Sequence, residues 1–404
     1  MSLITVEEAL STILSRMRFK GVERVGLNEA LGRVLAEDIV SGRNNPPLDN
    51  SAMDGYALIA ADIEKASPEN PVPLKLVGTV PAGCQSDRPL QPGEAMRIMT
   101  GAPVPPGADA VLMQEDTEVR GDTVLCKDRA AAGENIRRAG EDVRAGEVVI
   151  EKGVTLTPSH IGMLAVVGRS SIPVAQRPTV AVLSTGDEIA DLDEEATGPR
   201  IYNSNGYMLA AQIRAAGGVP VYLGIAPDRE EALMEHFQWA LQCDVVVSSG
   251  GVSVGDYDLV KASLDKLGNE MAFWKVAMKP GKPLAFGRIG TRPVFGLPGN
   301  PVSSFVSFEQ FVRPALRRMM GARELTLRTV QARLTETVTK KTKRLHFMSA
   351  TLESRNGEYT VTPAGQQGSG VLKSAMNANG LIVFPLESEQ LRSGELVTVQ
   401  LLET

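Results

Sequence analysis

The sequence DVVVSSGGVSVGDYD, residues 244–258, decides the fold class because an apolar run passes directly into a loop of small and acidic residues. Three consecutive valines predict a strand that is buried on both faces, which is typical of a parallel sheet. The strand ends in serines and glycines, and the loop carries Asp256 and Asp258. Alone, Gly250 and Gly251 would fit an ordinary tight turn and Asp258 a helix N-cap, so the surrounding segments must decide.

Residues 178–318 alternate predicted strands with predicted helices around this stretch. Strands are expected at 179–184, 219–225 and 244–249, with helices at 206–216, at 229–242, before 267 and from Pro301 onward. Such alternation predicts an α/β domain with a doubly wound, mostly parallel sheet. Ligands of these sheets bind beyond the carboxyl ends of the strands, so the chemistry is expected there.

The N-terminal segments follow other patterns. An apolar helical stripe at 5–17 begins with the capping-box pair Thr5 and Glu8, and a second helix is expected at 27–40. Residues 71–127 alternate short apolar stretches with Pro and Gly, which predicts a β-rich insert.

The segments that flank the α/β region are also distinct. Residues 145–153 predict a hairpin, and Thr157 followed by Pro158 predicts the start of a helix. A basic, glycine-containing joint at 317–328 leads to 329–404, where strand-like runs with Gly and Asn turns predict a small all-β domain.

Composition limits the function classes. The chain has 404 residues, which predicts roughly two to four domains. Its net charge of −6 argues against broad nucleic-acid binding. The N-terminus lacks a signal-peptide pattern, and no run reaches the ~18 apolar residues that span a bilayer. We therefore expect a cytoplasmic protein that binds neither nucleic acid nor membranes.

Cysteine and histidine usage argues against several kinds of metal site. The 3 cysteines are far apart and imply no disulfide framework or zinc site, which fits a reducing compartment. His160, His236 and His346 are scattered along the chain and are predicted to be structural or surface residues. We expect no histidine catalyst and no histidine-bound metal.

Three predicted strand ends carry loops that suit anions. They are Ser184-Thr185-Gly186-Asp187-Glu188, Ser249-Gly250-Gly251-Val252-Ser253 and Pro298-Gly299-Asn300-Pro301, the last of which opens a helix. Backbone N–H groups in such loops favour phosphate, and glycine lets a ligand approach the backbone. Lys275, Lys279 and Lys282 would add positive charge. Carboxylates beside a phosphate need a hard cation between them, and Mg²⁺ is the usual choice.

Each of these features also has a purely structural interpretation. Asp258 and Asp228 fit helix N-caps, the latter with Glu231 three residues on. Pro298 and Pro301 fit a strand end and a helix start, and the lysines fit solvated surface charges. The expected convergence of all three loops at one sheet edge favours a binding site.

Three further stretches are unusual for loops. They are PLDNSAMDGYA at 47–57, RIMTGA at 97–102 and NIRRAGED at 135–142. The last places two arginines before two acids, which fits either surface ion pairs of little energetic weight or arginines that bind an oxyanion.

Seven motifs in order closely resemble those of the molybdopterin molybdenumtransferase family, of the bacterial MoeA type, which is similar to the E domain of gephyrin. The motifs are DNSAMDGYA, RIMTGAPVP, NIRRAGEDV, STGDE, SSGGVSVGDYD, KPGKP and GLPGNPVSS. A single GG or PGNP would be weak, but the ordered set spans nearly the whole chain. The resemblance implies insertion of molybdenum from molybdate into adenylated molybdopterin, with release of AMP and with Mg²⁺ involved.

The resemblance also implies a multidomain α/β plus β architecture. Its parts would be an elongated discontinuous domain (1–45 and 140–175), a β-rich insert (46–139), an α/β domain like that of molybdopterin adenylyltransferase (176–326) and a small β-barrel-like domain (327–404). Only the resemblance implies that 1–45 and 140–175 belong together.

The site residues follow by motif. Asp54, Asp142, Asp228 and Asp258 would be catalytic acids that handle Mg²⁺ or molybdate, and Lys275 and Lys279 would also be catalytic. The implied substrate-binding residues are Thr100, Arg137, Ser184, Thr185, Gly186, Asp187, Glu188, Ser249, Gly250, Gly251, Ser253, Pro298, Gly299, Asn300, Pro301 and Ser369. Asp258 matches the motif better than Asp256. The role of the polar stretch 203–205, the division of the aspartates between Mg²⁺ and molybdate, and the choice between molybdate and tungstate stay open.

The family is typically dimeric, which implies a homodimer with its active site at the subunit interface. Contacts with the adenylyltransferase and with recipient molybdoenzymes are also implied. Two alternatives stay open. An adenylyltransferase would leave 1–175 and 329–404 unexplained, and a non-catalytic molybdopterin-binding scaffold would need a peptide groove that no apolar stripe indicates.

Overall fold

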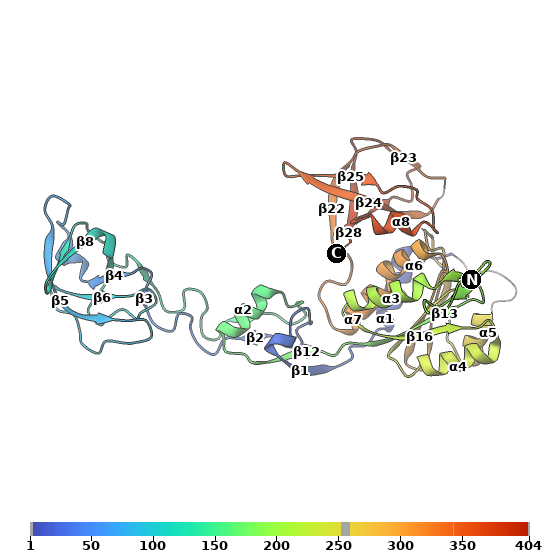
Figure 1. The fold of residues 1–404 in the computed structure, drawn as a ribbon, viewed down its shortest axis with the longest axis horizontal. Helices are drawn as coiled ribbons and strands as arrows, with labels where there is room; N and C mark the ends of the chain where they lie inside the picture. Colours follow the sequence, from blue (N-terminus) through green and yellow to red (C-terminus); the bar gives the residue numbers. More distant parts are fainter. Residues whose placement is uncertain (1–2, 252–258, 342, 403–404) are drawn as a thin grey trace.

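The computed structural model describes residues 3–251, 259–341 and 343–402. The molecule is elongated, with a β-rich lobe at one end and an α/β sheet with a C-terminal β domain at the other (Figure 1). Ser253, Asp256 and Asp258 lie outside the described residues. No helix within the described residues is long and apolar enough to cross a membrane.

The α/β sheet has six strands in the order β16-β13-β17-β21-β20-β18. The first four run parallel, whereas β20 is antiparallel to both β21 and β18, so the sheet is mostly parallel as predicted. The strands are β16 (Val219–Ala226), β13 (Thr179–Thr185), β17 (Val245–Ser249), β21 (Arg292–Leu297), β20 (Pro283–Ile289) and β18 (Phe273–Lys275).

The valine run of β17 forms the centre of two hydrophobic cores. Side chains alternate across a strand, so Val245 and Val247 enter one core while Val246 enters the other. The first core is covered by α1 (Val6–Arg16), α3 (Ser204–Ala215), α6 (Pro301–Ser307), a π-helical turn (Phe308–Val312) and α7 (Arg313–Met319). The second is covered by α4 (Glu230–Ala240) and α5 (Leu259–Lys266).

The predicted capping box of α1 is confirmed. The Thr5 N–H donates to Glu8 Oε2 at 2.9 Å, and the Glu8 N–H donates to Thr5 Oγ1 at 3.1 Å. Thr157 is likewise the N-cap of α2 (Pro158–Val166) as predicted.

The prediction of a helix at 27–40 is wrong. The segment forms only a 3₁₀ turn (Leu27–Glu29) before the strand β2 (Ile39–Val40). Gly32 has φ +72°, which an α-helix does not accommodate, and its N–H donates to Leu156 O at 2.8 Å. Long-range backbone pairing therefore overrides the helical pattern.

The prediction of a hairpin at 145–153 is also wrong. Its strand β11 (Val148–Ile150) pairs with β2 from the distant N-terminal segment, and β1 (Val22–Gly26) pairs with β12 (Ser171–Ala175). These two pairings and α2 surround one small core. The two segments therefore share one hydrophobic core despite their separation in the sequence.

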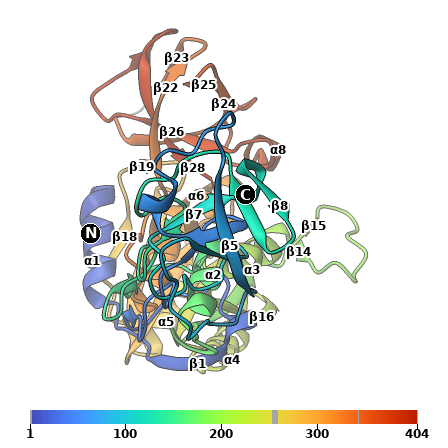
Figure 2. The same cartoon turned by 90° about the vertical axis from the view of Figure 1, so that its left-hand side faces the viewer.

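The β-rich lobe has a six-stranded sheet in the order β7-β4-β6-β5-β9-β8. Its strands are β7 (Ala110–Met113), β4 (Gly55–Leu58), β6 (Glu94–Ile98), β5 (Val72–Val80), β9 (Thr123–Cys126) and β8 (Thr117–Arg120). A short ladder joins β3 (Asn50–Ser51) to β10 (Ile136–Arg137) beside it. A second view, in which this lobe faces the reader, shows β14 (Ile189–Ala190) and β15 (Ile201–Tyr202) at the base of a loop that projects sideways (Figure 2).

The C-terminal domain contains a closed sheet. Its order is β19-β24-β25-β22-β28-β26, and an additional β24–β26 pairing closes the last five strands. They are β24 (Leu345–Arg355), β25 (Glu358–Pro363), β22 (Thr329–Leu334), β28 (Leu396–Leu401) and β26 (Gly380–Phe384). The added strand β19 (Met278–Lys279) comes from the α/β region and pairs with β24. This pairing places the KPGKP segment between the two domains.

Candidate active site

Adjacent parallel strands bring the predicted anion loops together. β13, β17 and β21 are neighbours, so their carboxyl ends meet at one edge of the sheet. The loops that follow them line a cavity of about 660 Å³, here called the large cavity. The predicted residues that line it are Thr185, Gly186, Glu188, Asp228, Ser249, Gly250, Gly251, Pro298, Gly299, Asn300 and Pro301.

Positions 250 and 251 require glycine for two reasons, the backbone conformation and the lack of room for a Cβ atom. Their φ angles are +94° and +65°, in the left-handed region. A Cβ on Gly250 would lie 2.6 Å from the Thr185 carbonyl oxygen, and one on Gly251 would lie 2.1 Å from Val260 Cγ2. An ordinary turn needs only the conformation, so the second requirement shows that this loop packs tightly against Thr185 and α5 at the cavity wall.

Two buried oxygens in the large cavity lack partners. Thr185 Oγ1 and Asn205 Oδ1 accept no hydrogen bond within the described residues. The Asn205 amide is held in place because its Nδ2 donates to Ser249 Oγ at 2.8 Å and to Gly299 O at 2.7 Å. Buried polar atoms are normally satisfied, so these oxygens are available to a ligand donor or a cation. Asn205, whose role the sequence left open, thus belongs to the site.

Ser184 and Asn203 support the cavity from beneath. The Ser184 hydroxyl donates to Asn203 Oδ1 at 2.9 Å, and Asn203 Nδ2 donates to the Tyr222 hydroxyl at 2.8 Å. Asn203 Oδ1 also accepts the Gly206 N–H at the start of α3. Ser184 therefore orients the wall of the cavity and does not line it.

Three carboxylates meet at the rim of the large cavity. Partial burial and the nearby charges of Asp187 and Glu188 raise the pKa of Asp228. The Asp228 N–H donates to Asp187 Oδ1 at 3.1 Å. The N-cap interpretation of Asp228 is wrong, because the N-cap of α4 is Arg229. Repulsion among these acids is relieved when a cation binds.

The donor set fits Mg²⁺. The cavity offers only oxygen donors of the kind a hard cation prefers, including Asp228 and the unpartnered oxygens of Thr185 and Asn205. No ready-made cluster of three or more His, Cys, Asp or Glu ligands occurs among the described residues. Mg²⁺ typically binds through one or two carboxylates, substrate phosphates and water, so a complete protein cage is not needed.

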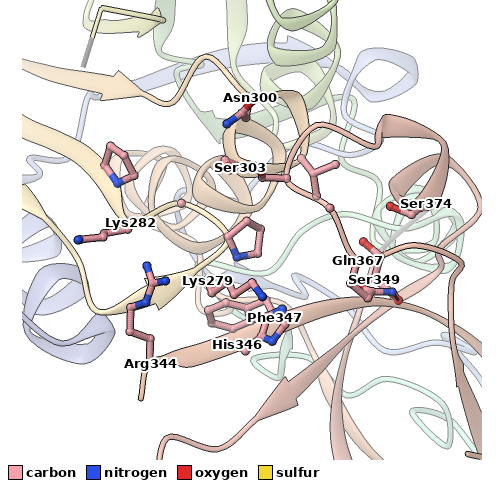
Figure 3. Close-up of a pocket in the computed structure, with 16 residues that line it drawn as sticks. Lys279, Lys282, Asn300, Ser303, Arg344, His346, Phe347, Ser349, Gln367 and Ser374 are labelled. Atoms are coloured by element: carbon pink, nitrogen blue, oxygen red, sulfur yellow. Dashed lines mark hydrogen bonds between the residues drawn. The ribbon is translucent and has the colours of Figure 1, made fainter. Parts of the chain in front are cut away.

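A second, smaller cavity of about 260 Å³ adjoins the first and is strongly basic. Lys279, Lys282 and Arg344 line it together with hydroxyl and amide groups (Figure 3). The polar lining residues are Asn300, Ser303, His346, Ser349, Gln367, Ser369 and Ser374. Pro283 and Asn300 line both cavities, so the two share a wall. We call this second space the basic cavity.

The C-terminal domain supplies half of the basic cavity. The parallel pairing of Lys279 with His346 brings Arg344, His346 and Ser349 against the KPGKP loop. The sequence patterns assigned no site role to these three residues. Ser369, a predicted substrate-binding residue, lines the basic cavity. Its carbonyl oxygen accepts the Val302 N–H at 3.0 Å. That donor of the α6 start is therefore used by the chain itself.

Lys275 occupies a different place from Lys279. It ends β18 and pairs with Pro283, at the same sheet edge as the loops. It is not among the described residues that line either cavity.

The structure does not bring the remaining predicted residues to this edge within one chain. Asp54, Thr100 and Arg137 lie in the distant β-rich lobe (Figure 1). Both the N–H and the hydroxyl of Thr100 donate to Asp54 Oδ1, at 2.7 and 2.8 Å, and these bonds lower the pKa of Asp54. Asp142 accepts from Asn45 Nδ2 at 2.8 Å.

The surface ion-pair interpretation holds for one of the two neighbouring arginines. Arg138 Nη1 lies 2.6 Å from Asp49 Oδ2, and both side chains are exposed. Arg137 lies in β10, opposite Asn50.

Comparison with known proteins gives matches along the whole chain. Residues 4–168 match the MoeA N-terminal region (domain I and II), residues 181–318 match a probable molybdopterin binding domain, and residues 331–402 match the MoeA C-terminal region (domain IV). Molybdopterin molybdenumtransferase 2 of Mycobacterium tuberculosis is 40% identical over 403 residues, covering 98% of each chain. The Bacillus subtilis molybdopterin molybdenumtransferase is 36% identical and covers 99% of this chain and 94% of its own.

Solved structures agree. The crystal structure of the molybdopterin biosynthesis moeA protein from Pyrococcus horikoshii superposes with a TM-score of 0.86 at 34% identity, covering 99% of this chain and 100% of that one. The family expected from the seven motifs is thereby confirmed. The chain belongs to the MoeA family of molybdopterin molybdenumtransferases.

Proposed function

We propose that this protein inserts molybdenum from molybdate into adenylated molybdopterin and releases AMP, in a reaction that requires Mg²⁺. The observation that carries the proposal is the pair of adjoining cavities with opposite chemistry. One suits phosphates with a cation, and the other suits a small oxyanion. The shared wall at Pro283 and Asn300 would bring the two substrates next to each other.

The large cavity would bind the adenylate. The backbone N–H of Gly251 would approach its phosphates, whereas the Gly250 N–H already donates to Leu297 O at 3.1 Å. Asp228 and Glu188, with Thr185 Oγ1 and Asn205 Oδ1, would hold Mg²⁺. The cation would neutralise the charge that develops on the phosphate when AMP leaves.

The basic cavity would bind molybdate. Lys279, Lys282 and Arg344 supply three positive charges around a space of about 260 Å³. The hydroxyls of Ser303, Ser349 and Ser369 add neutral donors. Tetrahedral oxyanions suit this combination of charged and hydroxyl donors. Lys275, at the same edge, and Ser253 and Asp258, outside the described residues, remain part of the proposed site.

The test is AMP release from adenylated molybdopterin with Mg²⁺, with and without molybdate. The proposal predicts molybdate-dependent release together with formation of active cofactor. Tight adenylate binding without release would favour a scaffold. Formation of the adenylate from ATP and unmodified molybdopterin would instead favour an adenylyltransferase.

We further propose a homodimer in which the β-rich lobe of one subunit completes the site of the other. The motif residues are divided between the β-rich lobe and the α/β sheet at opposite ends of the molecule (Figure 1), so Asp54, Thr100 and Arg137 would reach Asp228 only across a subunit boundary. The four-part domain division and a cytoplasmic location belong to the same proposal. Contacts with the adenylyltransferase and recipient molybdoenzymes would deliver the substrate and accept the product.

Subunit mixing tests the shared site. Asp54→Asn and Asp228→Asn homodimers are each expected to have low activity. When equal amounts are mixed and allowed to exchange, each heterodimer would contain one fully native site, and roughly a quarter of wild-type activity should return. A mixture that stays as inactive as its parts, although exchange is shown directly, would contradict the shared site.

A further inference from the structure

The basic cavity contains a buried imidazole to which the sequence patterns gave no functional role. His346 is 4% exposed and lies in β24 between two neighbouring strands. It pairs with Lys279 of β19 on one side and with Phe384 of β26 on the other. Its ring stacks on the Phe384 ring, with centroids 6.4 Å apart. Backbone pairing and stacking together fix the ring at the wall of the cavity (Figure 3).

The hydrogen bonding of this ring is incomplete. His346 Nδ1 is buried and makes no hydrogen bond within the described residues. The nearby ammonium group of Lys340 is engaged elsewhere, because it donates to the carbonyl oxygens of Arg344, Pro385 and Leu386. Because the buried Nδ1 has no acceptor for a proton, the proton of a neutral ring is better placed on Nε2, the nitrogen that a ligand in the basic cavity can reach.

The surroundings keep the ring uncharged. Burial, followed by the positive charges of Lys279, Lys340 and Arg344, lowers the pKa of His346 to about 4. At pH 7 the imidazole therefore has one N–H donor and one acceptor nitrogen. A fully ionised tetrahedral oxyanion has acceptors only, so it can be bound by this ring only through an N–H.

We propose that His346 is a substrate-binding residue whose Nε2–H donates to one oxygen of a divalent tetrahedral oxyanion held by Lys279, Lys282 and Arg344. The inference rests on the proposed function, which puts molybdate in the basic cavity. Ammonium and guanidinium groups attract any nearby anion. A neutral N–H donor on a fixed ring adds a hydrogen bond of defined direction without adding charge. His346 would therefore favour an anion that has an oxygen at that corner of a tetrahedron.

Oxyanion binding to the full chain tests this role. Dissociation constants for molybdate, tungstate and sulfate are measured by equilibrium dialysis for the wild type and two variants. His346→Phe keeps the ring and its stacking on Phe384 but removes the donor, and should weaken binding about tenfold to a hundredfold. His346→Gln places an amide N–H near the Nε2 position and should retain most of the affinity. His236→Phe, a histidine on α4 away from both cavities, is the matched control.

The wild type provides a second readout that needs no substitution. The chain has only 3 histidines, so NMR signals of their ring nitrogens can be assigned. Saturating molybdate should fix the Nε2–H tautomer of His346 and shift its nitrogen signals, while those of His160 and His236 stay unchanged. An unchanged His346 spectrum under saturation would overturn the inference, as would a folded His346→Phe protein with wild-type affinity.

The two proposals fail in different ways. Normal oxyanion binding that depends on His346, without any AMP release, would contradict the proposed reaction and leave the role of His346 intact. Molybdate-dependent AMP release that is unaffected in His346→Phe would do the reverse. A wild-type protein that binds none of the three oxyanions would overturn both. Equal effects on all three anions would assign His346 to tetrahedral oxyanions in general, and a larger effect on molybdate and tungstate would assign it to selection against sulfate.

Discussion

The two cavities at the sheet edge share a wall, yet their chemistry is opposite. The large cavity is rimmed by Asp228 and Glu188 and contains unpartnered oxygens, whereas the basic cavity is lined by Lys279, Lys282 and Arg344. Two anionic substrates placed side by side repel each other. Separate countercharges, a bound cation on one side and fixed protein cations on the other, allow both to bind. The difference shows how one edge can hold two anions without making them compete for one site.

The largest effect is expected from the backbone of the large cavity. Gly250→Ala would put a Cβ 2.6 Å from the Thr185 carbonyl in a loop with φ +94°. A displacement of this size at the phosphate loop should lower kcat/KM about a hundredfold. Gly224→Ala is the matched control, since Gly224 has φ +80° in the same domain with nothing within 4 Å of the added Cβ. Equal losses in both variants would mean that conformational strain alone is responsible.

Removing one charge from the basic cavity should have the next largest effect. Lys279→Met deletes a half-buried cation that lines this cavity and not the large one. The KM for molybdate should rise about tenfold to a hundredfold, with little change in the KM for the adenylate. Lys373→Met removes an exposed charge of the nearby helix α8 (Leu372–Met376) and controls for long-range electrostatics. A parallel rise in both KM values would contradict the separation of the two sites.

Asp228→Asn should affect activity and stability in opposite directions. Loss of the carboxylate should weaken Mg²⁺-dependent activity by about tenfold or more. Partial burial and the charges of Asp187 and Glu188 raise the pKa of Asp228 in the folded protein. Its ionised form therefore destabilises the fold above that pKa, and this penalty disappears as the pH falls below the unfolded value. The variant should therefore melt at a higher temperature than the wild type at pH 7 but not at about pH 3.

Added Mg²⁺ gives a further check on that variant. It should raise the melting temperature of the wild type more than that of Asp228→Asn, since the variant lacks one of the three carboxylates whose repulsion the cation relieves. A wild-type protein that is more stable than the variant without Mg²⁺ at pH 7 would show that Asp228 has a stabilising partner instead.

The smallest effect is expected in the distant lobe. Thr100→Val removes the hydroxyl that donates to Asp54 and leaves the backbone N–H, so the pKa of Asp54 should rise but stay below its ordinary value. The depressed pKa contributes stability above the unfolded value that is lost as the pH falls through the folded one. NMR titration of the carboxyl group measures the shift. Thr117→Val, whose hydroxyl donates to a carbonyl, is the control and should leave Asp54 unchanged.

The large cavity was predictable because its parts are local. Each anion loop directly follows an apolar strand, and the rule for parallel sheets places such loops together. In the structure, Gly250 and Asp228 line the large cavity beyond the carboxyl ends of β17 and β16, as this rule requires. Local patterns could not decide whether Asp228 is a helix N-cap or a site residue. The structure shows that the N-cap of α4 is the next residue, Arg229.

The basic cavity and the N-terminal half depend on distant pairings. Arg344 and His346 reach Lys279 only because β24 pairs with β19, across more than sixty residues of sequence. The segment 27–40 has a helical pattern, yet pairing with residues near Leu156 and with β11 makes it extended. A local pattern contains no signal for such contacts. Only the resemblance implied that these segments form one domain, and the β1–β12 and β2–β11 ladders show that the segments pair directly.

The separation of the two substrate sites is best tested by binding to two variants, Lys279→Met and Asp228→Asn. Dissociation constants for molybdate and for adenylated molybdopterin with Mg²⁺ are measured for each. A crossed pattern is predicted, in which Lys279→Met loses molybdate and keeps the adenylate while Asp228→Asn keeps molybdate and loses Mg²⁺-dependent adenylate binding. If both variants lose both ligands to the same extent, the two cavities act as one site and their separation is contradicted.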